Sequence, residues 1–151
     1  MVLYESLKAI FLHIDNHEKA FLGKHNLTVP RFYVLIHINN HPGINYIDLS
    51  DLLLCTKSNT TRIVQGMLKD GLITRKADPD DGRSYRLGLS VKGQALLDQV
   101  LPEYERFVNK LMSPLKAHEI NRYTKVSQHI ESTLAPKTVK TSKGPVISIG
   151  G

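Results

Sequence analysis

Residues 56–90 constrain the fold more than any other stretch, because they pair an amphipathic helix with a two-stranded ribbon. Thr56 can cap the helix, since its side-chain oxygen can accept a hydrogen bond from an otherwise unpaired backbone N–H. Apolar residues recur at helical spacing on one face, at Ile63, Val64, Met67 and Leu68. Gly71 stands where glycine commonly ends a helix. The pattern therefore predicts a helix between Thr56 and Gly71.

The residues after this glycine predict a β-hairpin. Segments 72–75 and 85–89 have the composition of short strands, and the second has Tyr85, Leu87 and Leu89 on one face. Between them, residues 78–83 read Asp-Pro-Asp-Asp-Gly-Arg and are rich in turn formers. The hairpin therefore ends in a charged loop with an arginine.

The polar face of the predicted helix contains no acidic residue, and each of its side chains can donate a hydrogen bond. These residues are Lys57, Ser58, Asn59, Thr61, Arg62 and Gln65. Such groups suit the base edges of the major groove, and Arg83 suits a narrow, A·T-rich minor groove. An ordinary surface helix and a solvated turn are the alternative, but the order of helix, glycine and basic hairpin favours DNA. We predict further backbone contacts from Lys76 and Arg86, with Asp81 orienting Arg83.

Residues 52–97 resemble the winged helix-turn-helix core of MarR-type (multiple antibiotic resistance regulator) bacterial transcription regulators. The matching blocks are KSNTTRIVQGMLKDGLI for the recognition helix and ADPDDGRSYRLGLSVKG for the wing. The family wing usually reads Asp, any residue, Arg, Asp or Gly, any residue, Arg. Asp78, Asp81 and Arg83 fit this pattern, whereas Asp80 replaces the middle arginine and removes one expected backbone contact. With the flanking helices, the resemblance covers roughly residues 1–135 in length and order.

Apolar periodicity predicts four further long helices and one short one. Residues 2–23 carry a heptad-like stripe at Leu3, Leu7, Ile10, Ile14, His17 and Phe21. A helix over about 29–40 is apolar on most sides, with Thr28 as its cap and Pro30 in its first turn. Residues 47–54 form the first helix of the helix-turn-helix, and 44–46 are a candidate third strand. After the hairpin, one long helix extends to about 112 and contains Pro102, and a last helix spans about 117–134.

The predicted fold class is mainly α with a small β-hairpin wing: a winged helix-turn-helix with N- and C-terminal dimerisation helices. One domain spans 1–135, with the core at about 44–91 and dimerisation helices at about 2–23 and 92–134. The terminal helices are more apolar than a small core can cover, which favours a homodimer; the alternative is that they fold back on their own core. Residues 136–151 read as a loose or disordered tail.

The net charge of +6 favours an anionic partner, although Lys137, Lys140 and Lys143 supply half of it. No secretory signal or membrane span is visible, and a single cysteine is compatible with the reducing cytoplasm. The chain has no phosphate-binding glycine loop, no nucleophile elbow and no recognisable histidine–carboxylate pair. We therefore predict a cytoplasmic protein that is not an enzyme, has no cofactor and does not bind membranes.

Two groups of side chains leave alternatives open. His13 and His17 are one helical turn apart and could share a metal, but no thiol or carboxylate completes the set, so no metal site is predicted. Cys55 precedes the recognition helix, where a helix N-terminus can lower a thiol pKa. A redox-responsive regulator acting through Cys55 is therefore an alternative, and a small packing residue is the favoured interpretation.

These patterns predict a homodimeric, sequence-specific repressor of transcription that binds a pseudo-palindromic operator in double-stranded DNA. The resemblance implies a small aromatic or phenolic effector, bound between the dimer helices and the DNA-binding lobe. The candidate lining residues are His13, Tyr33, His37 and Tyr46. The competing class is a winged-helix protein-interaction (adaptor) module, against which the acid-free face of residues 57–65 argues.

Overall fold

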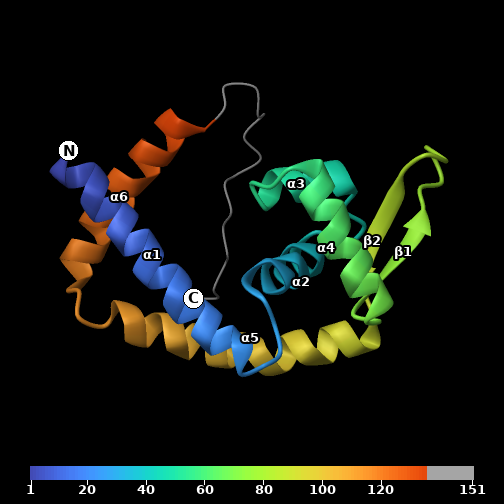
Figure 1. The fold of residues 1–151 in the computed structure, drawn as a ribbon, viewed down its shortest axis with the longest axis horizontal. Coiled ribbons are helices and arrows are strands. Elements are labelled where there is room, and N and C mark those ends of the chain that lie inside the picture. The colour runs from blue at the N-terminus through green and yellow to red at the C-terminus, as the bar shows by residue number, and fades with distance from the viewer. Residues whose placement is uncertain (136–151) are drawn as a thin grey trace. The chain divides into compact units, whose positions relative to one another are not determined.

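The computed structural model describes residues 1–135 and divides the chain into two compact units, Met1–Pro102 and the residues from Glu103 onward. The element order is α1 (Val2–Gly23), α2 (Val29–Asn40), α3 (Tyr46–Leu52), α4 (Lys57–Lys69), β1 (Ile73–Ala77), β2 (Tyr85–Leu89), α5 (Val91–Met112) and α6 (Ala117–Leu134) (Figure 1). The chain is mainly helical with one antiparallel hairpin, which confirms the predicted fold class. The tail predicted at 136–151 lies outside the described residues.

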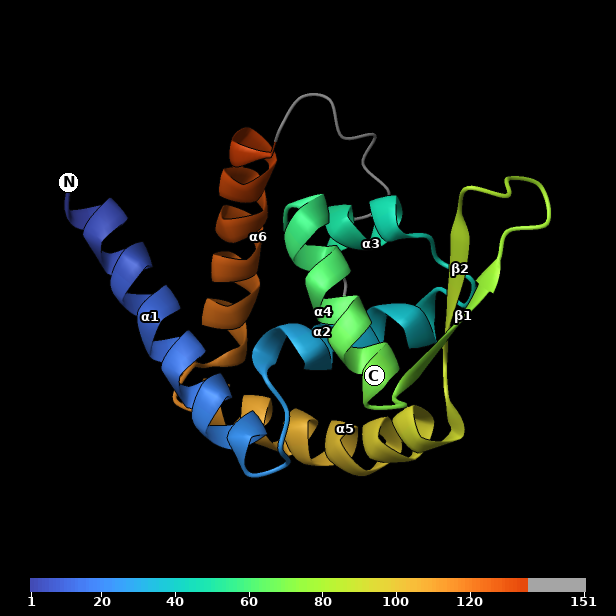
Figure 2. The ribbon, with the colours of Figure 1, turned by 45° about the vertical axis from the view of Figure 1, so that its right-hand side comes forward.

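The core of the first unit forms around α2, because nearly every side of this helix is apolar. Its buried residues are Phe32, Val34, Leu35, Ile36, His37 and Ile38. Helix α2 contacts α1, α3, α4 and β2, and Val64 and Met67 supply the buried face of α4. Figure 2 shows the hairpin beside α4, with its loop extending away from α2–α4. The packing leaves one face of α4 and the wing loop in solvent.

The prediction of a third strand at 44–46 was wrong, because a helix begins there instead. The Asn45 side chain accepts a hydrogen bond from the backbone N–H of Asp48 at 2.8 Å and caps α3. Tyr46 is therefore already helical, and α3 spans Tyr46–Leu52 rather than 47–54. Gly43 and Ile44, just before this helix, do pair with the wing, through backbone hydrogen bonds with Leu87 at 2.9 and 3.0 Å.

The hairpin has the predicted second strand, and its register places Arg75 opposite Leu87 and Ala77 opposite Tyr85. Strand β1 begins one residue later and extends further than the predicted segment 72–75. Of the apolar face predicted on β2, Leu87 is buried, whereas Tyr85 is 40% exposed. The Arg75 guanidinium covers the Tyr85 ring, with its central carbon 4.7 Å from the ring centroid.

Apolar side chains on α1 and on α6 are exposed within the single chain. On α1 they are Val2, Leu3, Tyr4, Leu7, Ile10, Phe11 and Leu12. Helix α6 has no buried residue, and Ile120, Tyr123, Val126 and Leu134 are exposed. His17, predicted within the packing stripe of α1, is also exposed. Helix α5 continues through Pro102, as predicted.

Candidate nucleic-acid interface

Helix α4 begins at a capped end and presents one polar face. The Thr56 hydroxyl oxygen accepts a hydrogen bond from the backbone N–H of Asn59 at 3.2 Å, as predicted. Thr28 is the N-cap residue of α2, as predicted, but its side chain makes no capping hydrogen bond. Among the candidate contact residues of α4, Lys57, Ser58, Arg62 and Gln65 are exposed, and Asn59 and Thr61 are half-buried. The burial of Val64 and Met67 therefore turns the predicted polar face outward.

Hydrogen bonds hold several polar side chains in the first half of α4. Nη2 of Arg62 donates a hydrogen bond to Oδ1 of Asn59 at 2.9 Å, and the Thr61 hydroxyl donates to the carbonyl of Lys57 at 2.8 Å. The Asn59 amide also contacts Sγ of Cys55 at 3.8 Å. Asn59 thus joins the helix start to Arg62, while Arg62 keeps other donors for a ligand.

The acidic residues of the wing loop order its backbone and hold one arginine. Arg86 forms ion pairs with Asp78 at 2.9 Å and with Asp80 at 3.8 Å. The backbone N–H of Asp80, followed by Arg86, holds the pKa of the Asp78 carboxyl below its ordinary value. Asp81 accepts a hydrogen bond from the backbone N–H of Arg83 at 3.0 Å. Asp81 therefore holds the Arg83 backbone, not its guanidinium.

Two basic side chains of the wing form no ion pair or side-chain hydrogen bond within the described part of the chain. Arg83 is exposed in the loop, and its guanidinium makes no hydrogen bond or ion pair among residues 1–135. Lys76 is exposed opposite Arg86 in the register. Like charges at such a position repel unless an anion lies nearby. Arg86 has its carboxylates, so Lys76 and Arg83 are the side chains open to an external anion.

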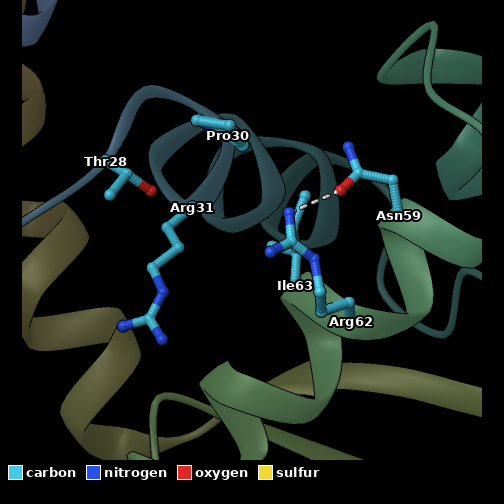
Figure 3. Close-up of a pocket in the computed structure, with 6 residues that line it drawn as sticks. All are labelled: Thr28, Pro30, Arg31, Asn59, Arg62 and Ile63. Atoms are coloured by element: carbon cyan, nitrogen blue, oxygen red, sulfur yellow. Dashed lines mark hydrogen bonds between the residues drawn. The ribbon is translucent and has the colours of Figure 1, made fainter.

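A surface pocket of about 460 Å³ lies between the start of α2 and the exposed side of α4 (Figure 3). Its lining residues are Thr28, Pro30, Arg31, Asn59, Arg62 and Ile63. Figure 3 shows the Arg62 guanidinium turned toward Asn59, and the Arg31 guanidinium directed away from both. None of the four residues predicted to bind an effector lines this pocket.

Among those four residues, Tyr33 and His37 lie together on α2, with ring centroids 6.4 Å apart. The Tyr33 hydroxyl donates a hydrogen bond to the buried Glu18 carboxylate of α1 at 2.9 Å. Burial, with repulsion from His41, lowers the pKa of His37 below its ordinary value. His13 is exposed on α1, and Tyr46 is half-buried at the first residue of α3.

The sequence analysis missed an ion pair between the start of α2 and the end of α4. Nη1 of Arg31 lies 2.7 Å from Oδ2 of Asp70. Both charges stand at helix ends where the helix dipole disfavours them. That is a signal of a partner elsewhere in the fold, and the sequence alone contains it.

The described residues contain no cluster of three or more histidine, cysteine, aspartate or glutamate side chains able to hold a metal ion. Cys55 is half-buried. Within residues 1–135, no helix has the length and apolar character needed to cross a membrane.

Comparisons with known proteins identify similar sequences. Residues 27–85 match the family model of the MarR family. The HTH-type transcriptional regulator BilQ of Clostridioides difficile (strain CD3) is 25% identical over 126 residues, which cover 81% of this chain and 85% of that protein. This match extends well beyond the helix-turn-helix.

Solved structures in complex with DNA share the fold. A MepR–DNA complex from S. aureus has a TM-score of 0.81 and 19% identity, covering 87% of this chain and 97% of that chain. A mutant MarR from E. coli complexed with operator DNA has a TM-score of 0.79 and 20% identity, covering 89% and 95%. These similarities establish a winged-helix fold of the MarR type.

Proposed function

We propose that this chain, which belongs to the MarR family of winged helix-turn-helix transcription regulators, is a homodimeric repressor released from its operator by a small-molecule effector. The observation that carries the proposal is the outward face of α4, which has donors but no carboxylate. The regulators of this family are not enzymes. The domain would span residues 1–135 and act in the cytoplasm.

On this proposal, α4 enters the major groove and the wing follows the DNA backbone. Arg62 and Asn59, already joined by a hydrogen bond, present one connected set of donors and acceptors to base edges. Lys57 and Ser58, in the first turn of α4, suit phosphate, because free backbone N–H groups and the helix dipole attract anions there. Arg83 would reach the minor groove, and Lys76 would contact a phosphate.

Exposed apolar faces support the homodimer. On α1, Leu3 is 63%, Ile10 54% and Phe11 63% exposed, and on α6, Tyr123 is 53% exposed. Monomeric soluble proteins rarely expose contiguous apolar surface of this kind, so the partner would be a second copy. A symmetric dimer then places two α4 helices in successive major grooves, about one helical turn apart, on a pseudo-palindrome.

An effector would release the repressor by binding better to a dimer whose α4 spacing does not match the operator. The Tyr33 hydroxyl, bonded to Glu18, and the neighbouring His37 ring, which is buried in α2, are the polar and aromatic groups that a phenolic or other small aromatic compound would contact. His13 and Tyr46 complete the proposed set.

The test is fluorescence anisotropy with duplex DNA from upstream of the gene, with competitor DNA and a salt series. Binding that resists competitor and weakens steeply with salt would support operator recognition. Arg62→Ala should weaken it, whereas Lys24→Ala, which removes an exposed charge after α1, is the matched control. Binding abolished by competitor would contradict sequence specificity, and no binding at all would favour the adaptor module.

A further inference from the structure

Arg31 and Asp70 both oppose the dipoles of their own helices. Arg31 is the third residue of α2, where the helix end carries partial positive charge, and Asp70 is the C-cap of α4, where it carries partial negative charge. Neither charge therefore stabilises the helix that contains it. The two charges instead form an ion pair with each other, in which Nη1 of Arg31 lies 2.7 Å from Oδ2 of Asp70.

A glycine inside α4 makes room for this contact. Gly66 lies in the helix interior, where glycine is less stable than alanine. A Cβ atom at this position would stand 2.9 Å from Nη2 of Arg31 and 3.9 Å from Cζ of the same guanidinium, and, apart from the nearby backbone of α4, no other atom of the described residues lies within 4 Å. Arg31 therefore crosses α4 directly over Gly66 on its way to Asp70.

Other bonds hold the backbone at this end of α4. Nζ of Lys92 donates to the carbonyl oxygen of Asp70 at 2.9 Å, and the Ser90 hydroxyl donates to the carbonyl oxygen of Gly71 at 2.6 Å. These bonds come from the residues after the wing and from α5. From α2, Arg31 contacts the side of α4 at Gly66 and Asp70.

We propose that Arg31 is a positioning residue for DNA recognition: its guanidinium, seated over Gly66 and paired with Asp70, fixes the orientation in which α4 presents its polar face. The inference rests on the proposed DNA-binding function. Base contacts require a defined helix orientation, whereas nonspecific attraction to phosphates depends on charge alone. Losing Arg31 should therefore lower specific affinity more than nonspecific affinity.

The first variant is Arg31→Ala, compared with wild type for operator and for competitor DNA over a salt series. In this variant operator affinity should fall about fivefold, which corresponds to about a fifth of the molecules holding α4 in the orientation that binds the operator. The salt slope should stay unchanged, because Arg31 makes no phosphate contact on this proposal, and nonspecific affinity should fall only slightly, through the Asp70 carboxylate that the variant leaves unpaired. Arg62→Ala is the control for a direct contact and should lower both affinities and the slope. The pair is partly exposed, at 29% for Arg31 and 46% for Asp70, so the variant should remain folded.

Two further variants separate positioning from general damage. Gly66→Ala favours the helix but intrudes on Arg31, so it should weaken operator binding without lowering stability, and it should have no further effect in the Arg31→Ala background. The exchanged pair Arg31→Glu with Asp70→Arg places each charge at the favourable helix end. It should recover most of the affinity that Arg31→Glu alone loses.

Each outcome bears on one of the two ideas. Wild-type operator affinity in Arg31→Ala would overturn the positioning role. A fall in the salt slope by about one, with equal loss of both affinities, would make Arg31 a phosphate contact instead. Additive effects of Gly66→Ala and Arg31→Ala would also overturn it. Failure of the wild-type protein to bind any upstream DNA would refute the proposed function itself.

Discussion

The guanidinium of Arg86 binds the carboxylate of Asp78 through two hydrogen bonds, from Nε to Oδ2 at 2.9 Å and from Nη2 to Oδ1 at 3.4 Å. Asp78 also accepts a hydrogen bond from the backbone N–H of Asp80 at 2.9 Å. One carboxylate therefore joins the loop of the wing to its second strand. Arg86, predicted from the sequence to touch the DNA backbone, is engaged inside the wing, and Arg83 is not.

Because Arg86 is bonded within the wing and Arg83 is not, substitutions of these two arginines should have different effects. Arg83→Ala should weaken operator binding and lower the salt slope by about one, because it removes one phosphate or minor-groove contact. Arg86→Ala should loosen the loop, seen as faster amide exchange at residues 78–84. Anisotropy titrations and hydrogen exchange measure the two effects. Slowed exchange or an unchanged loop in Arg86→Ala would contradict the structural role of that residue.

Thr60 carries a buried hydroxyl that costs stability. Its side chain is fully buried in α4, and Oγ1 has no hydrogen-bond partner among the described residues. Thr60→Val keeps the shape and removes the unsatisfied group, so it should raise the free energy of unfolding by about 1 kcal/mol. Thr61→Val is the comparison, since it removes a hydroxyl that is bonded to Lys57. Urea denaturation that gave a less stable Thr60→Val would mean that the hydroxyl has a partner.

Gly93 cannot accept a side chain. It is the third residue of α5, and a Cβ atom there would lie 1.9 Å from the carbonyl oxygen of Leu72. Gly93→Ala should therefore cost about 3 kcal/mol of stability or prevent folding, because the neighbouring atom is backbone. Gly23→Ala, with no atom within 4 Å of the added Cβ, should leave stability unchanged or raise it. Denaturation midpoints that agree between the two variants would contradict the close approach.

His37 should make stability depend on pH. Its folded pKa lies below the ordinary value of 6.5, first through burial and then through His41. Folding therefore favours the neutral ring, whose contribution is complete above pH 6.5 and is lost as the pH falls toward the lower folded pKa. His37→Gln should flatten this dependence, and His41→Gln should raise the His37 pKa in an NMR titration. A His37 pKa at or above 6.5 in the native protein would exclude this source of pH dependence.

The exposed face of α1 provides a test of assembly. Ile10 is 54% exposed, and Ile10→Asp would bury two unpaired carboxylates in a symmetric dimer. The expected result is a dimer weakened by about 100-fold or more, seen as monomers in light scattering. Asn16→Asp, an exposed polar position of the same helix, is the control for added charge. Ile10→Asp that remained dimeric would place the interface elsewhere.

Local patterns predicted most of the elements, and long-range pairs explain what the patterns missed. The helix at 2–23 and the strand at 85–89 were confirmed, because periodicity is a property of neighbouring residues, whereas the packing of the apolar stripe on that helix stays a prediction. Asn45 capped a helix where 44–46 had suggested a strand, since one side-chain hydrogen bond outweighed a short apolar run. The charge of Arg31 at a helix start signals a partner, but that partner stands 39 residues away, so no local pattern identifies it. The proposed DNA contacts and effector residues stay predictions.

The contact between Gly93 and Leu72 has a mechanical consequence. Leu72 follows the last turn of α4, and its carbonyl oxygen also accepts the backbone N–H of Ser90 at 3.1 Å. Contacts through side chains can absorb a small displacement by changing rotamer, but a backbone-to-backbone contact has no such slack. The joint between α4 and α5 is therefore stiff. When the first turn of α5 moves, the end of α4 must therefore move with it, by the same distance and at the same time.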